Sequence, residues 1–268
     1  MRILVVYAHP DDESFGPSAV LAKYARQGAK IYGLVATRGE HGNTDLTPKP
    51  SPEELGRLRE RDLRDAAAVI GFTHLEILGY EDGTLGEVPL REFEEQILAA
   101  IRRYHPKVMI TFGPAGITRH PDHLAIHRAA VAAFYRALAE GLGVRELYYD
   151  AVPPERAREM GLEGLPAGHP NTFVDVSETY PVKIAALRLH GRHIVDAREM
   201  AERLEREPQM VATLYRAWPE VNAGERVTGF LQNEARVLLT EGQRRGDTET
   251  RSGNRRTRNE KRETRDAK

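Results

Sequence analysis

The chain has 268 residues, of which 40% are apolar, and a formal net charge of −1 at pH 7. This length and composition can fill the core of one large domain or two small ones. The sequence contains no cysteine, which excludes disulfides, thiolate catalysis and cysteine-based zinc sites, so any transition metal must be held by His, Asp and Glu.

The first residues lack the long apolar segment and the small-residue cleavage site of a secretory signal. No stretch of the sequence approaches the roughly 18 apolar residues that are needed to cross a bilayer. We therefore expect a cytoplasmic protein that does not bind a membrane.

Apolar runs of strand length alternate with longer segments that have helical spacing. The predicted strands are Arg2–Ala8, Lys30–Thr37, His74–Leu78, Lys107–Phe112, Glu146–Asp150 and Thr172–Val176. The predicted helices are Pro17–Gln27, Pro52–Ile70, Leu90–Tyr104 and Asp122–Ala139, followed by two further helical segments at Pro181–His193 and Ala197–Trp218. This alternation is typical of an α/β fold, in which helices flank a mostly parallel sheet.

The second predicted helix has the clearest boundaries. Ser51 is its expected N-cap, Pro52 its first residue and Glu54 the acid of a capping box, while Gly71 ends it. The segment before it, residues 39–52, is polar and rich in Gly and Pro. We expect that segment to be an exposed loop above the carboxyl edge of the sheet.

The C-terminal segment differs in composition from the rest of the chain. Residues 242–268 carry ten Lys and Arg against five Asp and Glu, with one alanine as the only apolar residue. Such a segment cannot bury enough surface to offset its ordering entropy. We therefore expect one domain at 1–235 and a charged, disordered tail at 236–268. Interspersed acids and the lack of aromatic residues make nucleic acid an unexpected partner for this tail.

Two clusters of polar residues each follow a predicted strand. His9, Asp11 and Asp12 follow the first strand, and the segment "TFGPAGITRHPDHLAIH" (111–127) contains a second His-Pro-Asp sequence. Because the carboxyl ends of parallel strands meet at one edge of a sheet, the two clusters can face each other there. A dinucleotide-binding protein would instead place a G-x-G-x-x-G motif at this edge.

Two interpretations of these clusters are open. Acids after a strand often cap the next helix, and histidines there are often ordinary surface residues. The joint placement of the clusters favours a metal site, and two histidines with one carboxylate are typical of catalytic zinc, although iron(II) accepts the same ligands.

The motifs resemble those of the PIG-L/LmbE-like metal-dependent deacetylases, which remove acetyl groups from N-acetylglucosaminyl compounds. The similar segments are "AHPDDE" (8–13), "TRGEHG" (37–42), "RERDLRDAAAVIG" (59–71), "LGYEDG" (78–83) and "HPDH" (120–123). The resemblance covers residues 1–195 and implies a Rossmann-like fold and a homo-oligomer, either a trimer or a hexamer. Asp62 and Arg119 depart from the family pattern, and Arg119 bears on the shape of the pocket.

The resemblance also implies roles for individual residues. The expected ligands of one Zn²⁺ are His9, Asp12 and His123. The expected catalytic residues are Asp11 as general base, His120 as a protonated stabiliser of the oxyanion, and Asp122 as the residue that orients His120. The expected substrate-binding residues are Arg59 and Asp82, and Glu40 is a further candidate for a sugar hydroxyl. His190, near the end of a predicted helix, is expected to complement the helix dipole rather than to line the pocket.

These assignments predict a hydrolase that removes the N-acetyl group from an N-acetylglucosaminyl compound with metal-activated water. The favoured substrate at this stage is N-acetylglucosaminyl malate. One alternative is a Rossmann-like module that binds a nucleotide or sugar without chemistry, although such a module would need no unligated base like Asp11. A second alternative is an iron(II) oxygenase, although most such enzymes place their ligands on an antiparallel barrel.

Overall fold

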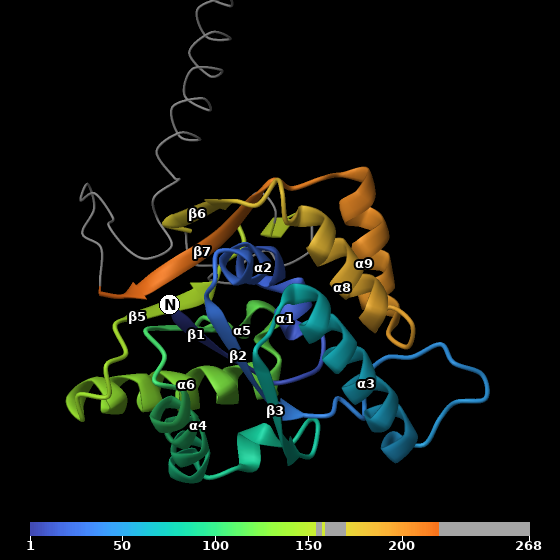
Figure 1. Cartoon of the computed structure of the whole chain (residues 1–268). Coiled ribbons are helices and arrows are strands. Elements are labelled where there is room, and N and C mark those ends of the chain that lie inside the picture. The colour runs from blue at the N-terminus through green and yellow to red at the C-terminus, as the bar shows by residue number, and fades with distance from the viewer. Residues whose placement is uncertain (154–156, 159–169, 220–268) are drawn as a thin grey trace, which may run out of the picture. The chain divides into compact units, whose positions relative to one another are not determined.

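The computed structural model describes residues 1–153, 157–158 and 170–219 (Figure 1). The tail expected at 236–268 and the domain end expected at 235 lie outside the described residues. None of the helices in the described ranges combines the length and apolar character that crossing a bilayer demands.

The described residues form a seven-stranded sheet in the order β3-β2-β1-β4-β5-β7-β6. The strands are β1 (Arg2–Tyr7), β2 (Lys30–Thr37), β3 (His74–Tyr80), β4 (Val108–Thr111), β5 (Glu146–Asp150), β6 (Thr172–Asp175) and β7 (Val211–Trp218). All neighbouring pairs from β3 to β5 are parallel, whereas β7 is antiparallel to both β5 and β6. The predicted mostly parallel sheet is confirmed.

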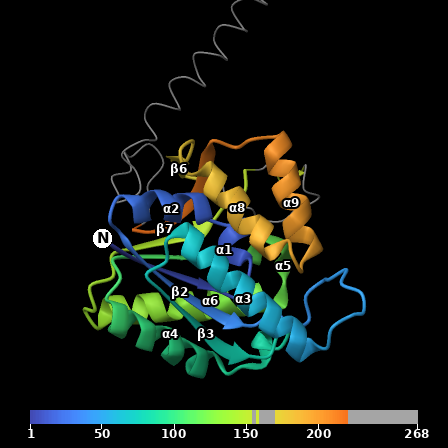
Figure 2. The ribbon, with the colours of Figure 1, turned by 45° about the vertical axis from the view of Figure 1, so that its right-hand side comes forward.

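Helices cover both faces of this sheet (Figures 1 and 2). One face carries α2 (Ser18–Arg26), α3 (Pro52–Ile70) and α8 (Tyr180–His190), with α9 (Val195–Arg206) packed against α8. The other carries α4 (Leu90–Tyr104) and α6 (Pro121–Ala139). Three short elements, α1 (Asp12–Phe15), η1 (Leu85–Glu87) and α5 (Gly116–Arg119), lie in the connections. Because both faces are covered, β1 and β4 are almost wholly apolar and buried.

Helix α3 has the boundaries that its sequence predicts. The Ser51 hydroxyl accepts a hydrogen bond from the Glu54 amide, and the Glu54 carboxylate accepts one from the Ser51 amide, which completes the capping box. Gly71 ends the helix in a left-handed conformation with φ 97°. Short-range signals therefore suffice to place this helix.

The predicted helix at Ala197–Trp218 is wrong in its second half. Helix α9 ends at Arg206, and residues 211–218 form strand β7. Pro208 prevents the helix from continuing, and Glu207 before it adopts an extended conformation with φ −127° and ψ 74°. β7 then pairs with β5 and β6, whose residues lie far from it in the sequence.

The loop after β2 meets α3 at Gly39, which has φ 63°. A Cβ atom on Gly39 would lie 2.0 Å from Nη1 and 2.4 Å from Cζ of Arg59, a residue only 4% exposed. Gly39 is therefore required both by its conformation and by the buried guanidinium group beside it.

Substituting Gly39 with Ala should lower the free energy of unfolding by about 2 kcal/mol or more, because the new methyl group is strained and displaces Arg59. Gly86→Ala is the matched control, since a Cβ at Gly86 meets nothing within 4 Å. It should change the free energy by less than about 0.5 kcal/mol. Urea denaturation measures both variants, and equal effects would contradict this account of the loop.

Candidate functional site

The first turn after β1 sends two neighbouring carboxylates in different directions. Asp11 has φ 107° and ψ −25°, a conformation unusual for any residue but glycine, and α1 begins at the next residue. Asp11 Oδ2 accepts a hydrogen bond from Arg59 Nη2 at 2.8 Å. Asp12 Oδ2 instead accepts one from the backbone amide of His9 at 2.7 Å. Because of this left-handed conformation, the two neighbouring carboxylates have different partners: Asp11 contacts Arg59, and Asp12 contacts the backbone of His9.

The second cluster is held by the start of α6. His123 lies in the first turn of this helix, where its ring stacks on Phe112 with centroids 4.0 Å apart. His123 Nδ1 lies 2.9 Å from the carbonyl oxygen of Gly116, so this nitrogen carries the ring proton. Gly116 has φ 58°, and a Cβ there would lie 2.8 Å from Cβ of His123. With Nδ1 held by the Gly116 carbonyl, Nε2 of His123 carries the lone pair, and this atom faces His9 after the end of β1.

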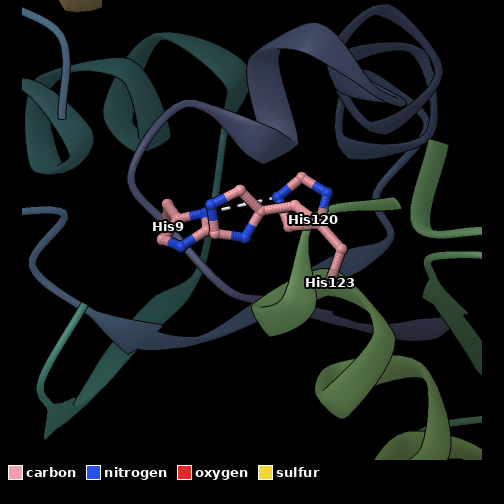
Figure 3. A group of neighbouring side chains, drawn as sticks. All are labelled: His9, His120 and His123. Carbon is pink, nitrogen blue, oxygen red and sulfur yellow. Dashed lines mark hydrogen bonds between the residues drawn. The ribbon is translucent and has the colours of Figure 1, made fainter. Parts of the chain in front are cut away.

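The two clusters converge at one point (Figure 3). His123 Nε2 lies 3.3 Å from His9 Nδ1 and 3.4 Å from Asp12 Oδ1, and His9 Nδ1 lies 3.6 Å from Asp12 Oδ2. Ligand atoms bound at 2.0–2.2 Å around a tetrahedral zinc ion are themselves about 3.4 Å apart. The two distances to Asp12 end on different oxygens of its carboxylate, and His120 also offers a nitrogen within 4.8 Å of those of His9 and His123. The end of β1 and the start of α6 therefore form a candidate site for one cation.

The outer nitrogen of His9 is held by two further carboxylates. His9 Nε2 lies 3.0 Å from Asp82 Oδ1 and 3.1 Å from Asp122 Oδ2. A proton on this nitrogen serves both acids and leaves Nδ1 as the ligand atom, which is the common arrangement of metal-binding histidines. Sequence reasoning did not foresee that both acids contact His9.

The surrounding charges suit a divalent cation. Burial disfavours a charged His9 ring, but hydrogen bonds to Asp122 and Asp82 and the charge of Asp12 raise the pKa of His9 to about 10. Burial, followed by the charge on His9, lowers the pKa of His123 to about 4, so its ring stays neutral. Without a cation His9 is therefore protonated on both nitrogens, which balances part of the surrounding negative charge, while His123 offers a free lone pair. A cation bound at His9 Nδ1 would take the place of the second proton.

Asp122 contacts His9 through its carboxylate and His120 through its backbone amide. The Asp122 carboxylate accepts hydrogen bonds from His9 Nε2 and from the amides of Gly83 and Leu85, and His120 is not among these donors. His120 caps α6, because its Nδ1 accepts the Asp122 amide at 3.3 Å. Burial, followed by the charge on His9, lowers the pKa of His120. Because Nδ1 accepts the Asp122 amide, the proton of a neutral His120 ring lies on Nε2.

Arg59 holds Asp11 from the side of α3. Its guanidinium group donates to the carbonyl oxygens of Pro10 and Gly39, at 2.5 and 2.6 Å, as well as to Asp11. Burial raises the pKa of Asp11 to about 6, against the opposing charge of Arg59. A carboxylate whose pKa lies this close to neutrality has the strength that a general base requires.

Of the other predicted substrate-binding residues, Asp82 lines the cavity and Glu40 does not. Asp82 lines the same cavity as Asp11 and accepts the amide of His41 at 3.0 Å. Glu40 does not line the cavity, and its carboxylate accepts the Asp82 amide at 3.0 Å. Arg119, which departs from the family pattern next to the second motif, is exposed and does not line the cavity either.

The cavity above the carboxyl edge of the sheet has a volume of about 670 Å³. Its walls include Asp150 at the end of β5 and Lys183 of α8, which sequence reasoning missed. Asp150 accepts a hydrogen bond from the Tyr7 hydroxyl at 2.8 Å. The one sequence signal for Asp150 is its position at the end of a predicted strand.

Comparison with known proteins identifies relatives of the chain. Residues 4–134 match the family model for GlcNAc-PI de-N-acetylase, PIG-L. The chain is 32% identical to a 1D-myo-inositol 2-acetamido-2-deoxy-alpha-D-glucopyranoside deacetylase of Kineococcus radiotolerans, over 82% of this chain and 75% of that protein. It is also 32% identical to the deacetylase of the same name from Thermomonospora curvata, over 74% of this chain and 82% of that protein.

Solved structures share the fold. The N,N'-diacetylchitobiose deacetylase of Pyrococcus horikoshii superposes with a TM-score of 0.63 at 19% identity, over 80% of this chain and 83% of that chain. The 4-carboxy-2-hydroxymuconate hydratase of Pseudomonas putida KT2440 superposes with a TM-score of 0.60 at 19% identity, over 85% and 99%. Because a hydratase shares this fold, the fold alone does not fix the reaction. The sequence relatives identify the class of enzyme. The chain belongs to the PIG-L/LmbE family of N-deacetylases, which are amide hydrolases.

Proposed function

We propose that the protein is a zinc-dependent hydrolase that removes the N-acetyl group from an N-acetylglucosaminyl compound. His9, Asp12 and His123 would hold one ion per chain. The observation that carries this proposal is the convergence of these three side chains beside the separate carboxylate of Asp11. His123 Nε2 lies 3.3 Å from His9 Nδ1 and 3.4 Å from Asp12 Oδ1, and Asp12 Oδ2 lies 3.6 Å from His9 Nδ1.

The bound ion would polarise the acetamide carbonyl and make a water molecule acidic enough to react near neutral pH. Asp11, whose carboxylate is fixed by Arg59 and lines the cavity beside His9 and His123, accepts the proton that the attacking water gives up. The same proton then passes from Asp11 to the nitrogen of the amine that leaves. The second proton of the water leaves with the acetic acid and passes to the released amine, so that acetate and the ammonium form of the amino sugar are the products. Asp11 returns to its starting charge.

His120 contributes as a hydrogen-bond donor. Its Nδ1 is occupied by the Asp122 amide, so the Nε2 proton is the one available to the substrate. His120 lines the cavity and its ring centroid lies 4.9 Å from that of His9. A neutral donor in this position stabilises negative charge that develops on the acetamide oxygen.

The cavity favours a neutral, hydroxyl-rich group attached to the amino sugar. Among the described lining residues are the aspartates Asp11, Asp12, Asp82, Asp150 and Asp196, against the cations Arg59 and Lys183. Both cations already donate to protein oxygens. Two carboxylates of a malate group would meet this acidic wall unfavourably. The names of the relatives support the same choice. We therefore propose the inositol glycoside as substrate in preference to N-acetylglucosaminyl malate, which the sequence alone had favoured.

Acetate release from a panel of substrates tests the proposal. The zinc-loaded protein should hydrolyse N-acetylglucosaminyl inositol with a kcat/KM about tenfold or more above that for N-acetylglucosaminyl malate, diacetylchitobiose and free N-acetylglucosamine. The rate should be the same under nitrogen, because hydrolysis needs no dioxygen. No acetate from any member would refute the proposed reaction, and a higher kcat/KM for the malate compound would refute the inositol assignment.

Substitutions of Asp11 and Asp12 distinguish the proposed general base from the proposed metal ligand. Asp11→Asn should keep the metal content of the wild type and lower kcat by about 100-fold or more. Asp12→Ala should lose both metal and activity, because it removes a ligand. Asp65→Asn, at a residue whose side chain is 47% exposed, is the matched control and should change neither. Metal analysis and steady-state kinetics provide the measurements, and full turnover by Asp11→Asn would exclude Asp11 as the base.

A further inference from the structure

Helix α8 lies against the turn that carries the catalytic carboxylates (Figures 1 and 2). Two of its residues, Lys183 and His190, make polar contacts with that turn. They are seven residues apart, which is close to two helical turns, so they share one side of the helix. Both lie beyond residues 4–134, the part of the chain that matches the family model.

His190 contacts the turn through Glu13. His190 Nε2 lies 2.8 Å from Glu13 Oε1, and each side chain is only 1% exposed. The other oxygen of Glu13 accepts the backbone amide of Asp11 at 3.2 Å. One buried carboxylate therefore links α8 directly to the backbone of the proposed base.

The link through Glu13 bears on the unusual backbone conformation of Asp11. A φ of 107° is costly for a residue with a side chain, and such a conformation persists only where the surroundings hold it. The amides of Ser14 and Phe15 also contribute, since they donate to the Asp11 carbonyl at 2.8 and 2.9 Å. If Glu13 moved, Asp11 would lose the acceptor for its own amide.

Lys183 holds the other end of the same turn. Its Nζ donates to the carbonyl oxygens of Ser14, Phe15 and Gly16 at 2.8, 2.6 and 2.7 Å. These three contacts match the three protons of an ammonium group. The end of α1 is thereby tied to α8 as firmly as Glu13 is.

We propose that His190 is a positioning residue for deacetylation, because it fixes Glu13 and through it the left-handed conformation of Asp11, while Lys183 fixes the end of the same turn. This inference rests on the proposed function for its link to activity. His190 does not line the cavity and is buried, so it acts through Glu13 and not on the substrate.

Two substitutions of His190 test the hydrogen bond itself. The amide nitrogen of Gln can take the place of the ring Nε2, whereas that of Asn corresponds to Nδ1 and cannot reach Glu13. His190→Asn should lower kcat about tenfold or more, leave KM within about twofold and keep the metal content, because only the base is misplaced. His190→Gln should stay within about threefold of the wild-type kcat. Arg188→Gln, on the same helix at a side chain that is 64% exposed, is the control and should behave as wild type.

Amide hydrogen exchange over residues 9–16 gives a readout that does not depend on activity. His190→Asn should speed exchange in this segment about tenfold, because the bonds to the Asp11 carbonyl open more often, while His190→Gln should match the wild type. Lys183→Met should also speed exchange there, and this second variant decides the case if His190→Asn does not fold.

The outcomes separate the two proposals. A wild-type protein that releases no acetate refutes the proposed function, and the exchange rates still decide whether α8 holds the turn. Unchanged exchange in His190→Asn or Lys183→Met overturns the inference. It is equally overturned if His190→Gln loses as much activity as His190→Asn, or if metal content falls in parallel with kcat.

Discussion

The site depends on the way in which the ring of His9 is held. Asp82 and Asp122 both contact its Nε2, at 3.0 and 3.1 Å, and this fixes the side of the ring that faces outward. Its Nδ1 must then face Asp12 and His123. Because the acids come from the loop after β3 and from the start of α6, one ring ties three segments of the sheet edge together. A shift in any of them would misplace one of the proposed metal ligands.

The parallel sheet makes this arrangement possible. β1 and β4 are neighbours that run in the same direction, so the segments that follow them emerge side by side. Helix N-termini and tight turns then aim the polar groups, as the cap at His120 and the left-handed Asp11 show. Burial raises the pKa of Asp11 and lowers that of His123, so the same packing that places these groups also sets their protonation.

The sequence predicts those features that depend on neighbouring residues. The limits of α3 follow from Ser51, Glu54 and Gly71, and the two His-Pro-Asp sequences indicate a shared sheet edge. Strand β7 was missed because its partners are distant in the chain and only pairing reveals it. The contact between the Asp122 carboxylate and His9 could not be foreseen for a similar reason, since the two residues lie 113 positions apart. Whether the predicted ligands and base act as proposed is a separate question, which proximity alone does not answer.

Anomalous diffraction from crystals of the zinc-loaded protein tests the central claim most directly. The account predicts one zinc ion bonded to His9 Nδ1, Asp12 and His123 Nε2 at about 2.0–2.2 Å, with the Asp11 carboxylate still paired with Arg59 and not bonded to the ion. An ion bound instead between Asp82 and Asp122, or one that takes Asp11 as a ligand, would contradict it.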